Sequence, residues 1–210
     1  MSKRKANTFT AALTVVTLWT VAFFFSLLFI DCVNNSGHDI ATPRRTAYPR
    51  IEIYDSVYLP IESMPINIEV NAHTILQEDS LRDNSDGSRW INIMYPGYNA
   101  TLHCTFTPVN ATTVGTVTGN RNERMSLNAG DLTSELTEIT TPHGTTGRIL
   151  TTPESTVTPL QFIATDNRSW VFSGALYLTR QHTGNIDSIA PILHSVRRDI
   201  VHSIRNLRQK

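Results

Sequence analysis

The sequence has few cysteines, and it lacks the short motifs that identify common catalytic and metal sites. Its two cysteines, Cys32 and Cys104, allow at most one disulfide and match no zinc-ligand spacing. It contains no glycine-rich phosphate loop, no GxSxG, no HExxH and no CxxC pair. The sequence therefore predicts no cofactor and no enzymatic activity.

An excess of positive charge is also missing from most of the chain. The formal net charge is zero, and three basic residues, Lys3, Arg4 and Lys5, stand together at the start. Without residues 1–31, 15 basic and 17 acidic residues remain, a net charge of −2. Domains that bind nucleic acid carry a clustered basic excess. A nucleic-acid partner is therefore not expected.

One long hydrophobic stretch is present, from Thr8 to Ile30, and it contains no charged residue. A helix needs about 20 residues to cross a bilayer, so this stretch is long enough. Because positive residues stay in the cytoplasm, the basic cluster before it favours export of the rest of the chain. Residues 1–31 are therefore predicted to be a signal or membrane anchor.

Two forms of this anchor remain open: an uncleaved helix, or a lipoprotein signal in which Cys32 carries the lipid. A cleaved secretory signal normally ends in small residues, whereas this stretch ends in Leu28-Phe29-Ile30-Asp31. Asp31 also departs from the small residue expected before a lipidated cysteine. The protein is expected at the cell membrane in either form.

Beyond the anchor, residues 32–48 are predicted to be a polar tether, and residues 49–210 an extracytoplasmic domain. Alternating apolar and polar residues indicate strands. Asp86-Gly87 and residues 166–169 are typical of turns. The predicted strands cover residues 51–53, 66–70, 90–94, 101–107, 148–152, 160–165 and 170–178.

Two helices are predicted from a period of about 3.6 residues. The first runs from an N-cap at Asn122 to Pro142, and the second begins at a cap at Asp187 or Ser188, with Pro191 in its first turn. Together with the strands they predict an α+β fold, a mostly antiparallel sheet flanked by two helices and preceded by one hydrophobic anchor helix. The order of elements is similar to that of PsbP-like domains. The first helix rests on Met125, Ala129, Leu132, Leu136 and Ile139, and the second on Ile189, Ile192, Leu193, Val196, Ile200, Ile204 and Leu207.

Several short patterns are typical of glycosylation. Asp-Ser-aliphatic triplets resemble the O-glycosylation pattern of the Bacteroidetes periplasm and make Ser56 and Ser80 candidate acceptors. Three Asn-x-Ser/Thr triplets would be acceptors only in a eukaryotic secretory route. They leave open a viral or eukaryotic type II membrane glycoprotein. These asparagines are Asn99, Asn110 and Asn167.

Several blocks of the sequence resemble the GldD gliding-motility lipoproteins of Bacteroidetes. The blocks are Trp90–Ile93 with Tyr95-Pro96, Thr101–His103 with Pro108, Phe162–Asp166, Phe172–Tyr177, and Asp187–Pro191 followed by Arg197–Ile200. The resemblance covers about residues 43–210 and is strongest from Thr165 to Lys210.

This resemblance implies a membrane-anchored accessory protein of the gliding and type IX secretion machinery, with Cys32 lipidated. It implies a non-catalytic role through contacts with other envelope proteins. Because Val33–Gly37 lacks the early acidic residues of surface-exported lipoproteins, the domain is expected to face the periplasm. The arginines Arg197, Arg198 and Arg205 lie off the apolar stripe of the last helix and form the candidate partner surface.

The alternative is a periplasmic module that binds a small molecule or lipid between the sheet and the helices. Trp90, Trp170, Tyr95 and Tyr98 would line such a pocket, although aromatic residues of this kind are also typical of cores and turns.

Overall fold

The computed structural model describes Trp19 and residues 51–78, 85–155, 157–178 and 186–210. The predicted anchor and tether, apart from Trp19, lie outside these residues. Among the residues described, no helix is both long and apolar enough to cross a membrane.

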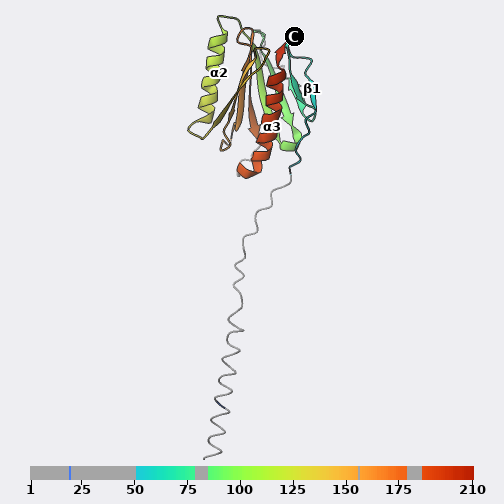
Figure 1. Cartoon of the computed structure of the whole chain (residues 1–210), viewed down its shortest axis with the longest axis vertical. Helices are drawn as coiled ribbons and strands as arrows, with labels where there is room; N and C mark the ends of the chain where they lie inside the picture. Colours follow the sequence, from blue (N-terminus) through green and yellow to red (C-terminus); the bar gives the residue numbers. More distant parts are fainter. Residues whose placement is uncertain (1–18, 20–50, 79–84, 156, 179–185) are drawn as a thin grey trace, which may run out of the picture. The chain divides into compact units, whose positions relative to one another are not determined.

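A seven-stranded antiparallel sheet forms the centre of the domain (Figure 1). Each strand pairs with its neighbours in antiparallel register. In order across the sheet, the strands are β4 (Ile75–Glu78), β5 (Arg89–Tyr95), β6 (Ala100–Pro108), β10 (Trp170–Leu178), β9 (Leu160–Thr165), β8 (Thr146–Thr151) and β7 (Glu135–Thr140).

Helices α2 (Val114–Ala129) and α3 (Ile186–Asn206) cover opposite faces of the sheet, which are called here the α2 face and the α3 face (Figure 1). Two short ribbons accompany α3: β1 (Tyr58–Pro60) pairs with β3 (Glu69–Asn71), and β2 (Ile66–Asn67) pairs with β11 (Arg208–Gln209). A 3-10 turn, η1 (Pro96–Tyr98), joins β5 to β6. The predicted α+β class, a mostly antiparallel sheet flanked by two helices, is confirmed.

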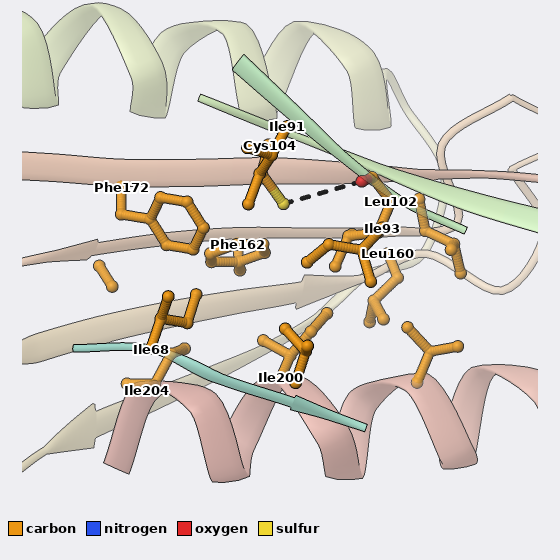
Figure 2. Close-up of a cluster of buried hydrophobic side chains, with 14 of the residues drawn as sticks. Ile68, Ile91, Ile93, Leu102, Cys104, Leu160, Phe162, Phe172, Ile200 and Ile204 are labelled. Atoms are coloured by element: carbon orange, nitrogen blue, oxygen red, sulfur yellow. Dashed lines mark hydrogen bonds between the residues drawn. The ribbon is translucent and has the colours of Figure 1, made fainter. Parts of the chain in front are cut away.

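The main core lies between the sheet and α3 (Figure 2). Alternate residues of each central strand point to this side, because side chains of a strand alternate between the two faces of the sheet. In β6 these are Leu102, Cys104 and Phe106. Helix α3 contributes the stripe predicted from its spacing, and the stripe is buried throughout. Each such aliphatic side chain contributes about 1.5–3 kcal/mol when fully buried.

The strands predicted from residue 90 onward are confirmed, with ends shifted by at most two residues. The turn between β9 and β10 is also confirmed. Asp166 organises it by accepting bonds from the backbone N–H groups of Arg168, Ser169 and Trp170, and from the Ser169 hydroxyl. Asn167 takes the left-handed conformation (φ 56°), which asparagine tolerates better than most residues.

The first predicted helix exists, but its bounds are wrong, because prediction and structure agree only from Asn122 to Ala129. Helix α2 begins at Val114 and ends at Ala129, where Gly130 follows with a φ of +58°. Such a conformation suits glycine and ends the helix. Leu136 and Ile139 lie in strand β7 instead, within a Glu-Leu-Thr-Glu-Ile-Thr segment whose β-branched residues favour a strand. Their helical spacing to Met125 is coincidental.

Two further boundaries differ from the prediction. Residues 51–53 form no strand, and the first described strand begins only at Tyr58. Ile51 packs against the main core, and the bonds described below hold the residues that follow, Tyr54 and Asp55. Helix α3 already includes Ile186, so its cap precedes Asp187, and Pro191 lies beyond the first turn.

Gly174 of β10 marks a position where the core leaves no room for a side chain. A Cβ placed there would lie 2.5 Å from Cε1 of Phe162 and 2.9 Å from Sγ of Cys104. We expect Gly174→Ala to lower the free energy of unfolding by about 1–3 kcal/mol, because overpacking forces neighbouring groups to shift. Urea denaturation of the protein in detergent micelles measures this change.

Gly119→Ala in the middle of α2 is the matched control. No atom lies within 4 Å of the added Cβ, and Gly119 is exposed. Alanine in a helix interior is favoured over glycine by about 0.5–1 kcal/mol, so this variant should be stabilised. If Gly174→Ala and Gly119→Ala changed the free energy of unfolding by the same amount, the close packing at Gly174 would be contradicted.

Candidate functional site

The predicted site residues fall in different environments. Cys32 and Ser80 lie outside the described residues. Ser56 is exposed in the segment before β1, and its glycosylation stays a prediction. Arg205 is exposed on α3, whereas Arg197 and Arg198 bond to other parts of the domain.

Arg197 fastens α3 to the edge strand β7. Its Nη2 donates to Oγ1 of Thr137 at 2.6 Å and to Oε1 of Glu135 at 3.2 Å. Beside it, a groove of about 640 Å³ runs between β7 and α3, with Val201 and Arg205 on its helix side. Arg205 is therefore the one of the three predicted arginines that presents its charge to solvent at this groove.

A buried carboxylate, Asp199, is the centre of a polar cluster on the other flank of α3. Only 2% of Asp199 is exposed. Its Oδ1 accepts bonds from Oη of Tyr58 at 2.9 Å, Nη2 of Arg198 at 3.1 Å and Nδ2 of Asn71 at 3.5 Å. Its Oδ2 has no hydrogen-bond partner among the described residues. We call Tyr58, Asn71, Arg198 and Asp199 the Asp199 cluster.

Burial and charge act against each other in this cluster. Burial raises the pKa of Asp199 above its ordinary value, although Tyr58, Arg198 and Asn71 all act to lower it. Burial alone would lower the pKa of Arg198, but the hydrogen bond and charge of Asp199 raise it overall. The pKa of Tyr58 is also raised, first by burial and then by Asp199. The cluster is thus built around a carboxylate that is costly to ionise.

The Asp199 cluster binds the backbone of the segment that enters the domain. Nη2 of Arg198 donates to the carbonyl of Tyr54 at 2.8 Å, and Nδ2 of Asn71 donates to the carbonyl of Asp55 at 2.7 Å. This segment follows the predicted tether in the sequence. The cluster therefore fastens the backbone at Tyr54 and Asp55 to helix α3.

Stacked tyrosines hold the same segment from the sheet side. The rings of Tyr54 and Tyr98 lie 4.4 Å apart, and the backbone N–H of Tyr54 donates to Oη of Tyr98 at 2.8 Å. Tyr98 in turn shares a 2.9 Å bond with Oγ of Ser195 on α3. Oη of Tyr54 accepts the N–H of Gly97 at 2.7 Å. The segment at Tyr54, the 3-10 turn η1 and helix α3 are thereby joined at one place.

The next turn of α3 repeats this pattern against β1 and β3. His202 stacks on Tyr58 with ring centroids 3.5 Å apart, and its Nε2 lies 2.7 Å from a carboxylate oxygen of Glu69. Oγ of Ser203 donates to the carbonyl of Glu69 at 2.6 Å. These polar side chains serve the attachment of the small ribbon to α3.

The other chemically reactive groups are committed to the fold. The Cys104 thiol is buried, burial raises its pKa strongly, and it lies 3.8 Å from the carbonyl oxygen of Leu102 (Figure 2). Of the four aromatic residues predicted to line a ligand pocket, Tyr95, Tyr98 and Trp170 are packed in the core, and Trp90 is half-buried in β5. Within the described part of the chain, no group of three or more His, Cys, Asp or Glu residues is placed to hold a metal ion.

The sequence contained a signal for part of this site. Asp199 lies next to Ile200 and three residues after Val196, so a charged residue stands on the apolar stripe of α3. A buried charge at such a position needs partners. Tyr58 and Asn71 are 141 and 128 residues away in the sequence, and nothing local identifies them.

The chain was compared with protein families, curated proteins and solved structures. A family model described as gliding motility lipoprotein GldD matches residues 38–208. No curated protein and no solved structure matches. The match begins after Cys32, and it includes the Asp199 cluster and both helices.

Removing the Asp199 carboxylate should destabilise the domain. Asp199→Ala leaves the Tyr58 hydroxyl and the Arg198 guanidinium without their shared acceptor. We expect a loss of about 2–4 kcal/mol in the free energy of unfolding, since removing one member of a buried charged network leaves the other polar groups buried without a hydrogen-bond partner. Urea denaturation measures the loss. Asp131→Ala, at an exposed turn position, is the control and should change stability by less than about 0.5 kcal/mol.

The raised pKa of Asp199 predicts a distinct pH dependence. Above the ordinary value of 3.8, the folded state holds the proton more tightly than the unfolded state, so this carboxyl's contribution to stability falls as pH rises through the folded-state pKa. Asp199→Asn lacks this titration. The wild type should therefore lose stability relative to Asp199→Asn as pH rises from about 4 toward neutrality. A relative gain would mean that the folded-state pKa is lowered.

Proposed function

This chain belongs to the family of gliding motility lipoproteins described as GldD, and we propose that it is a non-catalytic accessory protein of the gliding and type IX secretion machinery. Membership associates the chain with gliding motility and with membrane anchoring. The family match over residues 38–208 is the observation that carries the proposal.

A non-catalytic role is supported by how the domain uses its polar residues. Asp199, Tyr58 and Arg198 bond to one another or to backbone groups of neighbouring segments, while His202 stacks on Tyr58 and bonds to the Glu69 carboxylate. These bonds secure the attachment of residues 51–60 to α3. A protein whose task is to hold a domain in place at the membrane needs such an attachment.

In the proposed arrangement Cys32 carries the lipid, and the domain faces the periplasm. Cys32 is the cysteine that directly follows the hydrophobic stretch. From Cys32 to Tyr54 there are 22 residue steps, which reach at most about 75 Å when fully extended. The tether thus sets an upper limit on how far from the bilayer the domain meets its partners.

The groove between β7 and α3 is the proposed contact surface. Strand β7 is the last strand on its side of the sheet, so one edge of its backbone is not used by a neighbouring strand of this sheet. Such an edge can pair with an extended segment of another protein. Arg205 lies at the adjacent groove and favours a partner segment that carries acidic residues.

Site-specific cross-linking in cells tests this proposal. A photo-activated amino acid replaces Arg205 in the full-length chain, and products are purified from membranes through a tag after Lys210 and identified by mass spectrometry. We expect gliding or type IX secretion components among the products. The same probe at Gln77, an exposed position of the opposite edge strand β4, should capture fewer of them.

Comparing the probes at Arg205 and Gln77 tests the accessory function and the proposed contact surface separately. Envelope-machinery components captured equally from both positions would contradict the β7 surface and leave the accessory function standing. The absence of any such component from both positions, with the protein present in the membrane fraction, would contradict the accessory function itself.

A further inference from the structure

Helix α2 carries a charged residue on the side that faces the sheet. Its sheet-facing residues recur at helical spacing: Val114, Val117, Arg121, Met125 and Asn128. Val114, Val117 and Met125 pack in a small apolar cluster with residues of β9 and β10. Arg121 stands between Val117 and Met125 and is half-buried, where an apolar residue would ordinarily cover the sheet.

The sheet beneath Arg121 is polar as well. Thr105 of β6 pairs directly with Ser173 of β10, and both point to the α2 face. Between this surface and α2 lies a cavity of about 170 Å³, lined by Arg121, Arg124, His103, Thr105, Ser173 and Tyr177 among others. Pockets for drug-sized ligands are usually about 300–1,000 Å³, so this one fits only a small group.

One wall of the cavity is fixed by a pair of amide side chains. Nδ2 of Asn128 donates to Oε1 of Gln161 at 2.9 Å, and Nε2 of Gln161 donates to the carbonyl of Met125 at 3.2 Å. Gln161 is buried in β9. These bonds hold the C-terminal half of α2 at a set distance from the sheet, so the cavity belongs to the folded domain.

The cavity holds two positive charges and no negative charge. Its lining includes Arg121 and Arg124 but no aspartate or glutamate. Among the described residues, neither arginine forms a salt bridge; Nη2 of Arg121 has a long 3.4 Å bond to Oγ1 of Thr107. Burial and the nearby charge of Arg124 both lower the pKa of Arg121. A partly buried guanidinium without an acidic partner is costly, and an anion would remove that cost.

We propose that this cavity binds a compact oxyanion, a phosphate group that is either free or part of an anionic lipid headgroup, between Arg121 and Arg124. Guanidinium groups bind phosphate oxygens through paired, charge-assisted hydrogen bonds. The hydroxyls of Thr105 and Ser173 lie on the floor of the cavity and offer further donors. This site is separate from the Asp199 cluster, which lies with α3 on the other face of the sheet.

The competing explanation is structural. An arginine can cover a sheet with its aliphatic stem while its head group reaches water, without any ligand. The two explanations differ in what they predict for added phosphate. Only a binding site gives a saturable response confined to Arg121 and Arg124.

NMR of the arginine Nε–Hε groups tests the proposal on the full-length protein in maltoside micelles. One arm adds inorganic phosphate, and the other adds phosphatidylglycerol to phosphate-free micelles. We expect saturable shifts of the Arg121 and Arg124 signals in at least one arm. Arg124→Gln, an exposed position that should not disturb folding, should weaken binding about tenfold or more, and Arg121→Gln likewise. Arg168→Gln, in the exposed turn after β9, should leave it unchanged.

The arms identify the source of the anion. Saturation by inorganic phosphate alone indicates a soluble ligand, and saturation by phosphatidylglycerol alone indicates a lipid headgroup. The proposal is overturned if neither probe gives a saturable shift. It is equally overturned if Arg168 responds as strongly as Arg121, or if Arg124→Gln binds as tightly as the wild type.

Discussion

The packing of α3 against the sheet is the interaction on which the rest of the domain depends. The apolar stripe of α3 fills the core between the helix and the strands (Figure 2). Gly147 of β8 shows how closely the two approach, since a Cβ there would lie 2.7 Å from Cγ2 of Ile204. At the end of the helix, the Thr145 hydroxyl donates to the carbonyl of Leu207 at 2.9 Å. The interface between α3 and the sheet therefore fixes the position of the helix relative to the strands.

The same helix holds the segment from Tyr54 to Tyr58. Asp199 and Arg198 bond to Tyr58 and to the backbone carbonyl of Tyr54, while Ser195 bonds to Tyr98. A buried carboxylate is a poor source of net stability, because its desolvation offsets most of its attraction to partners. Its role is better understood as specificity: it selects one position for residues 51–60 on α3. For a membrane-anchored protein, that position determines where any pull from the anchor enters the domain.

Strong, regular patterns in the sequence were sufficient to predict much of this fold. Strands β5 and β6 alternate clearly, β9 and β10 are apolar runs on either side of a recognisable turn, and the stripe of α3 is long and apolar. Helix α2 was predicted too far along the chain because its sheet-facing stripe is short and includes Arg121 and Asn128, while Leu136 and Ile139 continue a helical spacing across Gly130 by chance.

The candidate site was harder to predict, for a different physical reason. Arg198 and Asp199 are adjacent, but their partners come from residues 54–71, more than 120 positions earlier. The helical and strand periodicity of a sequence contains no information about side-chain contacts over such a distance along the chain. The three arginines do lie off the apolar stripe of α3, as predicted. Arg197 and Arg198, however, bond to acceptors within the domain, which leaves them less available for contacts with another protein. Arg205, which lacks such neighbours in the described structure, is the one left for a contact surface.

Native-state hydrogen exchange tests most directly the claim that α3 fastens both the sheet and the segment from Tyr54 to Tyr58. The amide of Tyr54 donates to Oη of Tyr98, which bonds to Ser195 of α3, and the amide of Ala72 donates to the carbonyl of Val57. These two amides therefore report on the attachment of this segment. If the account is right, they exchange only with the opening that also exposes the amides of α3, at the same free energy. If they exchange through a separate, low-energy opening while α3 stays protected, the segment is not fastened to the helix and the account is contradicted.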